Sequence, residues 1–126
     1  MKRFGLIAVV ATIIILAGGV YLFSRGAKPE TVPPLSGYEY FWGNGCPHCE
    51  NVDKFFQSWK DKDKLTLNKM EVWYNKANAG IMLARGTACG IARSDMAVPL
   101  LVTPEGKCIL GDVDIINHLN EIKFDE

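Results

Sequence analysis

The stretch from Gly43 to Val52, GNGCPHCENV, contains two cysteines separated by a proline and a histidine. Such a C-x-x-C pair can be a redox centre, half of a metal site or a structural bridge. The segment before it, 38–42 (YEYFW), is aromatic and strand-like, and apolar residues at helical spacing follow it. We therefore expect the motif at the end of a strand, on the first turn of a helix.

That position favours redox chemistry. The unpaired N–H groups and the positive end of the helix dipole stabilise a thiolate, so Cys46 is predicted to have a lowered pKa and to be the nucleophile. Cys49 lies further along the helix, close enough to bond Cys46 and to act as the resolving thiol. His48 can direct a hydrogen bond or positive charge toward the Cys46 thiolate, and Pro47, which fixes φ, helps to hold the turn rigid.

The rest of the domain alternates strand and helix patterns. The run at 98–103 (VPLLVT), which is apolar up to Thr103, is read as a buried strand, and the turn Pro104-Glu105-Gly106 leads from it into a short partner strand. The expected elements are strand 38–42, helix 47–60, strand 65–74, helix 75–88, strand 98–103, strand 107–110 and a last helix from Asp112. Asn75 is expected to cap the helix that ends at Ala88. The order β-α-β-α-β-β-α predicts an α/β domain in which a four-stranded mixed sheet has helices on both faces.

Cys46-Pro47-His48-Cys49 after an aromatic strand, together with Val98-Pro99 opening a later strand, resembles the thioredoxin-like superfamily. The resemblance covers residues 38–123. It implies that Pro99 is cis and faces Cys46, and that the backbone of Val98 is free to pair with an extended substrate chain. It also implies thiol–disulfide oxidoreductase activity on protein thiols and disulfides, with the Cys46–Cys49 disulfide as the only redox group and no separate cofactor.

The chain departs from the subtypes of that superfamily. The C-P-H-C centre is similar to that of periplasmic disulfide-introducing proteins, but the chain has no room for their large helical insertion. The compact domain looks more like glutaredoxin. Glutaredoxins usually have Thr before Val-Pro and a Gly-Gly-Asp-like glutathione element, where this chain has Ala97 and Gly111-Asp112. Dependence on glutathione is therefore an alternative and not the main expectation.

Three other residues are candidates for function. Cys89 and Cys108 can form a second, stabilising disulfide, remain buried free thiols or act as a redox relay. Glu39, in the strand that leads to the motif, is either a buried carboxylate that assists proton transfer to Cys49, as the superfamily often has, or an exposed residue on the strand. Core packing is the default interpretation of Trp42.

The N-terminus indicates a membrane segment. Residues 4–23 contain 20 residues without a charge, which suffices to cross a hydrocarbon core of about 30 Å. Lys2 and Arg3 precede this run, and the slight excess of positive charge favours a cytoplasmic N-terminus. A cleaved signal peptide and a buried core helix are the alternatives. We predict an anchor at 1–23, a Pro/Gly-rich linker at 24–37 and the thioredoxin-like domain at 38–126.

Charge and cysteine usage limit the function classes. Lysine and arginine total 14 and so do the acidic residues, so no basic surface indicates nucleic-acid binding. The main hypothesis is a membrane-tethered, extracytoplasmic thiol–disulfide oxidoreductase, reset by a membrane redox partner. The alternatives are a module that carries copper or zinc on Cys46, Cys49 and His48, and an adaptor whose disulfide is inert. No resident metal is predicted under the main hypothesis.

Overall fold

The structure is a computed structural model that describes residues 2–24 and 32–124. The chain divides into two compact units, residues 1–31 and 32–126, which are described separately. The first contains the helix α1, Lys2–Ser24. Residues 25–31, which form most of the predicted linker, lie outside the described residues.

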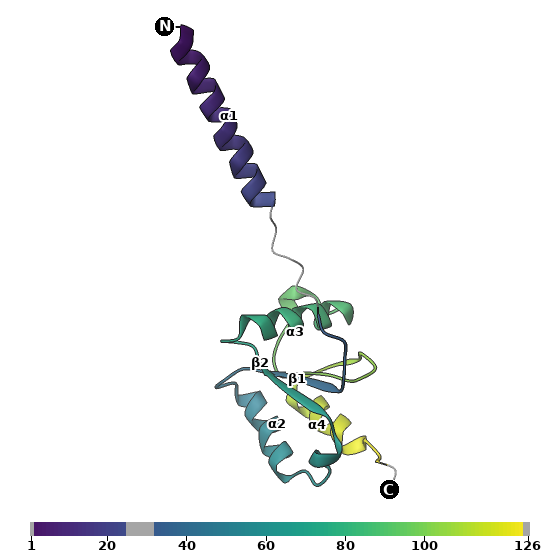
Figure 1. Cartoon of the computed structure of the whole chain (residues 1–126). Helices are drawn as coiled ribbons and strands as arrows, with labels where there is room; N and C mark the ends of the chain where they lie inside the picture. The colour runs from purple at the N-terminus through teal and green to yellow at the C-terminus, as the bar shows by residue number, and fades with distance from the viewer. Residues whose placement is uncertain (1, 25–31, 125–126) are drawn as a thin grey trace. The chain divides into compact units, whose positions relative to one another are not determined.

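The second unit confirms the predicted order of strands and helices (Figure 1). Its main elements are β1 (Tyr38–Trp42), α2 (Pro47–Ser58), β2 (Leu67–Glu71), α3 (Lys76–Ala88), β3 (Leu100–Val102), β4 (Cys108–Leu110) and α4 (Asp112–Glu121).

The four strands form one mixed sheet in the order β2-β1-β3-β4. β1 and β2 are parallel, with Trp42 opposite Glu71, whereas β3 is antiparallel to both β1 and β4. Leu100, the first residue of β3, lies opposite both Phe41 and Leu110. The ends of β1, β2 and β4 and the start of β3 therefore meet at one edge of the sheet, and the C-x-x-C motif follows β1 at this edge.

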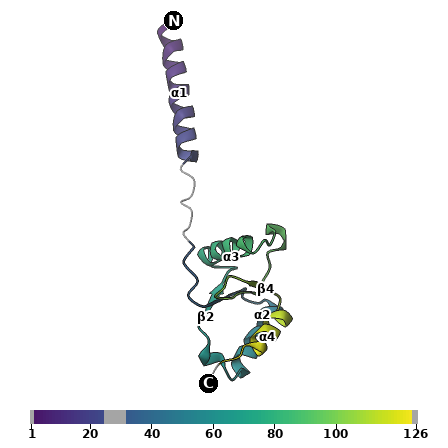
Figure 2. The ribbon, with the colours of Figure 1, turned by 90° about the vertical axis from the view of Figure 1, so that its right-hand side faces the viewer.

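Helices cover both faces of the sheet, as predicted. Figures 1 and 2 show α3 on one face and α2 with α4 on the other. Because successive residues of a strand point to opposite faces, Tyr40 packs with α2 and α4, and Phe41 packs with Met82 of α3. The core on the α2 and α4 face comprises Tyr40, Val52, Phe56, Leu101, Ile109, Ile115 and Leu119.

The strand predicted at 65–74 is shorter in the structure, where β2 ends at Glu71. The Glu71 carboxylate accepts hydrogen bonds from the backbone N–H groups of Trp73, Tyr74 and Asn75, at 2.8, 2.9 and 3.1 Å. These contacts turn the chain away from the sheet. Asn75 then caps α3, as predicted, by accepting a hydrogen bond from the Asn78 N–H at 3.2 Å.

The membrane anchor predicted for residues 1–23 is not confirmed. In the part of the chain that the structure describes, no helix combines the length and the apolar character needed to cross a membrane.

Candidate redox site

Cys46 and Cys49 form a disulfide at the start of α2, with their Cα atoms 5.2 Å apart. Cys46 is the N-cap residue of the helix, and its sulfur accepts a hydrogen bond from the Cys49 N–H at 3.2 Å. Pro47 occupies the first turn, where its missing N–H leaves no hydrogen bond unmade. The same N–H and the helix dipole would stabilise a thiolate on Cys46 once the disulfide opens.

The loop that contains Pro99 faces this disulfide. The Val98–Pro99 peptide bond is cis, as the resemblance implies, and the Cys46 sulfur lies 3.9 Å from the Val98 carbonyl oxygen. The carbonyl oxygen of Pro99 accepts a hydrogen bond from the Gly111 N–H at 3.0 Å, just before α4. The structure therefore brings Val98, Pro99 and Cys46 together and ties the loop to the start of α4.

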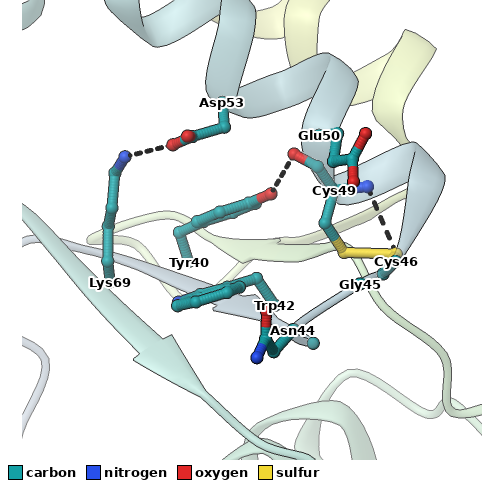
Figure 3. Close-up of a pocket in the computed structure, with 10 residues that line it drawn as sticks. Tyr40, Trp42, Asn44, Gly45, Cys46, Cys49, Glu50, Asp53 and Lys69 are labelled. Atoms are coloured by element: carbon teal, nitrogen blue, oxygen red, sulfur yellow. Dashed lines mark hydrogen bonds and ion pairs between the residues drawn. A yellow bond between two sulfur atoms is a disulfide. The ribbon is translucent and has the colours of Figure 1, made fainter.

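Tyr40 lies beneath Cys49. Its hydroxyl donates a hydrogen bond to the Cys49 carbonyl oxygen at 3.4 Å (Figure 3), and its side chain is buried. Burial raises the pKa of Tyr40 above its ordinary value, and the carboxylates of Asp53 and Asp112 raise it further. The phenol is therefore neutral near pH 7, and its hydroxyl can donate the hydrogen bond to Cys49.

Glu39 is buried, at 3% exposure, so the expectation of an exposed position is wrong. Both of its carboxylate oxygens accept hydrogen bonds from Arg85 of α3, at 2.8 and 2.9 Å. Since Glu39 is next to Tyr40 in β1, its side chain points to the α3 face of the sheet, away from Cys49. Proton transfer from Glu39 to Cys49 is therefore not supported by this geometry. The group beneath Cys49 is the phenol of Tyr40, which the sequence prediction missed.

A cavity of about 340 Å³ opens beside the disulfide. In Figure 3, Trp42 and Tyr40 lie along one side of it, and Lys69 forms an ion pair with Asp53 at its far end, at 2.8 Å. Its lining comprises Tyr40, Trp42, Gly43, Asn44, Gly45, Cys46, Cys49, Glu50, Asp53 and Lys69. Cys46 is only 5% exposed and Cys49 only 4% exposed. This cavity therefore offers a route by which another molecule approaches their sulfurs.

The imidazole of His48 has a different partner from the one predicted. Its Nδ1 lies 3.1 Å from Oδ1 of Asp112, the first residue of α4. The amide of Asn51 donates to the other oxygen of the same carboxylate at 2.6 Å. The hydrogen bonds from Asn51 and from His48 hold the pKa of Asp112 below its ordinary value. This contact links the first turns of α2 and α4, and neither Asn51 nor Asp112 was predicted for the site.

Glu71 fixes the loop on the other side of the motif. Besides the three N–H groups at the end of β2, its carboxylate accepts a hydrogen bond from the Asn44 N–H at 3.4 Å. Partial desolvation raises the pKa of Glu71, but the four backbone hydrogen bonds together lower it below the ordinary value of 4.5. The Trp73 ring packs directly on Gly43, where a Cβ atom would overlap it. A side chain at position 43 would therefore displace the Trp73 ring.

The structure chooses among the alternatives for the other two cysteines. Cys89 and Cys108 form a disulfide with a Cα–Cα distance of 6.1 Å, which joins the end of α3 to β4. Both residues are half-buried, and they lie on elements other than those that carry Cys46 and Cys49. The bridge is thus placed to stabilise the packing of α3 against the hairpin.

Metal binding has little support in the geometry. Over residues 2–24 and 32–124, no group of three or more His, Cys, Asp or Glu side chains is arranged to hold a metal ion. In this structure His48 Nδ1 contacts Asp112, and Cys46 and Cys49 are bonded to each other.

Comparison with known proteins identifies a distant similarity to a solved structure. No protein-family model matches the chain, and no curated protein matches it. Among solved structures, the chain is similar to buckwheat glutaredoxin in a complex with glutathione, with 17% identity, 73% of this chain and 76% of that chain covered, and a TM-score of 0.49.

Three features define the fold without the comparison. They are the strand order, the cis Pro99 and the position of the cysteines. The fold is thioredoxin-like. Within it, Cys46 and Cys49 form a pair at C-x-x-C spacing on the first turn of the first helix after the central strand.

Proposed function

We propose that the protein is a membrane-tethered thiol–disulfide oxidoreductase that acts on polypeptide substrates outside the cytoplasm. The observation that carries the proposal is the disulfide between the N-cap Cys46 and Cys49, which faces the cis Pro99 loop and borders a cavity. In the oxidising direction, a substrate thiolate attacks Cys46, forming a mixed disulfide and releasing the Cys49 thiolate. A second substrate thiol resolves the mixed disulfide and leaves the substrate oxidised.

The reducing direction uses the same two sulfurs. The Cys46 thiolate attacks a substrate disulfide, and Cys49 then displaces the reduced substrate and restores the internal disulfide. Either direction leaves the pair in the wrong state for the next cycle. A redox partner must therefore reset it, and we propose that this partner lies in the same membrane.

The distribution of exposed apolar side chains favours a polypeptide substrate. Among the described residues outside α1, the exposed large hydrophobic side chains are Trp73, Tyr74, Leu110 and Val113. Trp73 and Tyr74 follow β2, Leu110 is the last residue of β4 and Val113 lies in the first turn of α4, so all four are near the sheet edge that carries the motif. An apolar rim of this kind is typical of a surface that contacts another protein chain. Glutathione is less favoured, because the Asp112 carboxylate is already bound by His48 and Asn51.

Two features support the location. The uncharged run at 4–23 has the length of a membrane-spanning helix, and the Cys89–Cys108 disulfide fits an oxidising compartment. Fractionation of cells that produce the full chain should place it with the membranes. Protease treatment of membrane vesicles of known orientation should then cleave the domain from the extracytoplasmic side. Recovery of the full chain in the soluble fraction would contradict the tether.

Trapping of mixed disulfides tests the activity. The full-length Cys49→Ser variant should form a covalent adduct with a disulfide-containing polypeptide, because Cys46 can attack but nothing resolves the product. The Cys46→Ser variant is the matched control and should form none. Equal adduct yields from the two variants, or none from either, would contradict the assignment of Cys46 as the nucleophile.

A further inference from the structure

The contact between His48 and Asp112 has a chemical consequence for the substrate. A carboxylate only accepts hydrogen bonds near neutral pH, so the proton in the 3.1 Å contact is carried by Nδ1 of His48. In the neutral ring the second nitrogen, Nε2, then carries a lone pair. The His48 side chain is 69% exposed, whereas that of Asp112 is only 15% exposed. The ring is therefore held by its Nδ1 side, and the His48 side chain is otherwise largely exposed to solvent.

The surroundings make Asp112 the group that sets this orientation. Asp112 follows Gly111, which is bound to the Pro99 carbonyl oxygen, so its carboxylate is fixed relative to the cis Pro99 loop. Asn51 holds the other carboxylate oxygen at 2.6 Å. His48 lies in the first turn of α2, which begins at the Cys46 N-cap, and through Asp112 its ring is linked to the Pro99 loop that faces the Cys46 sulfur.

From this arrangement we propose that Asp112 positions His48 as a general base for the incoming substrate thiol. This inference rests on the proposed function and adds the group that activates the substrate. Free thiols are mostly protonated near pH 7, whereas only the thiolate attacks a disulfide. His48 therefore accelerates the first step by acting on the substrate, in addition to any effect on the Cys46 thiolate.

Nε2 of His48 takes the proton of the substrate thiol, and the substrate sulfur uses its electron pair to bond the Cys46 sulfur. The Cys46–Cys49 bond breaks at the same time, and Cys49 leaves as a thiolate. The imidazolium then returns its proton to Cys49 or to water. A second substrate thiol completes the reaction, so two substrate thiols become one disulfide and the enzyme disulfide becomes two thiols.

A pair of small nucleophiles separates this role from a structural one. Cysteamine and selenocysteamine carry the same ammonium group, but at pH 7 the thiol of the first is largely protonated, whereas the selenol of the second is ionised. Only cysteamine has a proton for His48 to remove. The experiment measures the rate at which each reagent opens the Cys46–Cys49 disulfide in the oxidised full-length protein, by acid quench and alkylation of the free thiols.

The Asp112→Asn variant should react with cysteamine about 3- to 10-fold more slowly than the wild-type protein, and with selenocysteamine at the same rate within twofold. Asp114→Asn is the matched control, because Asp114 lies exposed in the same first turn of α4, and it should leave both rates unchanged. His48→Gln supplies a second variant in case Asp112→Asn does not fold. Its exposed side chain can still donate to Asp112 but cannot take a proton, and it should show the same selective loss.

Equal slowing with both reagents would overturn the proposal, because it would show that Asp112 acts on the disulfide or on the fold. Unchanged rates with both reagents in both variants would overturn it as well. Either result would leave the proposed function intact. Failure of the wild-type disulfide to react with either reagent would instead contradict the proposed function itself.

Discussion

Removal of the second disulfide should destabilise the protein without removing its redox centre. The double substitution Cys89→Ser and Cys108→Ser opens a loop closed over a sequence separation of 19 residues. In the chain-entropy treatment, such a bridge lowers the entropy of the unfolded chain by about 11 cal/mol/K, or about 3 kcal/mol at 25 °C. We therefore expect the free energy of unfolding to fall by about 3 kcal/mol.

Urea unfolding of the full chain, followed by tryptophan fluorescence, measures this loss. The three tryptophans of the chain, Trp42, Trp59 and Trp73, all lie within the thioredoxin-like domain, so the signal reports on that domain. With a typical dependence of about 1–3 kcal/mol per molar urea, the midpoint should fall by about 1–3 M. The Cys46–Cys49 pair is kept oxidised in both proteins so that only one bridge differs.

The double variant Cys46→Ser and Cys49→Ser is the matched control. Its bridge closes a loop with a sequence separation of only 3, so the same treatment gives it the smaller effect. A loss under about 1 kcal/mol for the Cys89 and Cys108 variant would refute the entropy argument. An equal or larger loss for the control would refute the assignment of the structural role to the longer loop.

Three further substitutions test contacts around the site. Glu39→Gln removes the buried partner of Arg85 and should cost about 3–5 kcal/mol in urea unfolding, whereas Asp53→Asn, which breaks the exposed pair with Lys69, should cost less than about 1 kcal/mol. Similar losses in the two variants would contradict the difference in burial.

Glu71→Gln should destabilise the protein at pH 7. Because the pKa of Glu71 is lowered in the folded protein, its contribution is present above the ordinary value of 4.5 and is lost as the pH falls through the folded value. The unfolding curves of variant and wild type should therefore converge in acid, and a gap that persists unchanged at pH 3 would contradict the charge-based explanation.

Local patterns were sufficient to predict most of the fold. The apolar spacing after Pro47, the cap at Asn75 and the turn before β4 each depend on neighbours in the sequence, and the structure confirms them. The exception is the end of β2. Trp73 and Tyr74 have side chains that favour strands, but the Glu71 carboxylate binds their N–H groups and removes them from the sheet.

The candidate site depended more on contacts between distant residues. His48 and Asp112 are 64 positions apart, and periodicity does not show that the first turns of α2 and α4 meet. The alternation of side chains along β1 was sufficient to predict that Tyr40, and not Glu39, lies beneath Cys49. Alternation along β1 places Tyr40 on the same face as Trp42, which borders the motif, and Glu39 on the opposite face.

The two disulfides join cysteines that are consecutive in the chain, Cys46 to Cys49 and Cys89 to Cys108. Four cysteines permit three pairings, and this is the one in which the bridges neither cross nor enclose one another. During synthesis, Cys49 is made when Cys46 is the only earlier cysteine. Cys108 is made when Cys89 is the only earlier cysteine still unpaired. Oxidation in order of appearance therefore produces the native pairing directly. Oxidation in that order requires no later exchange between the two bridges.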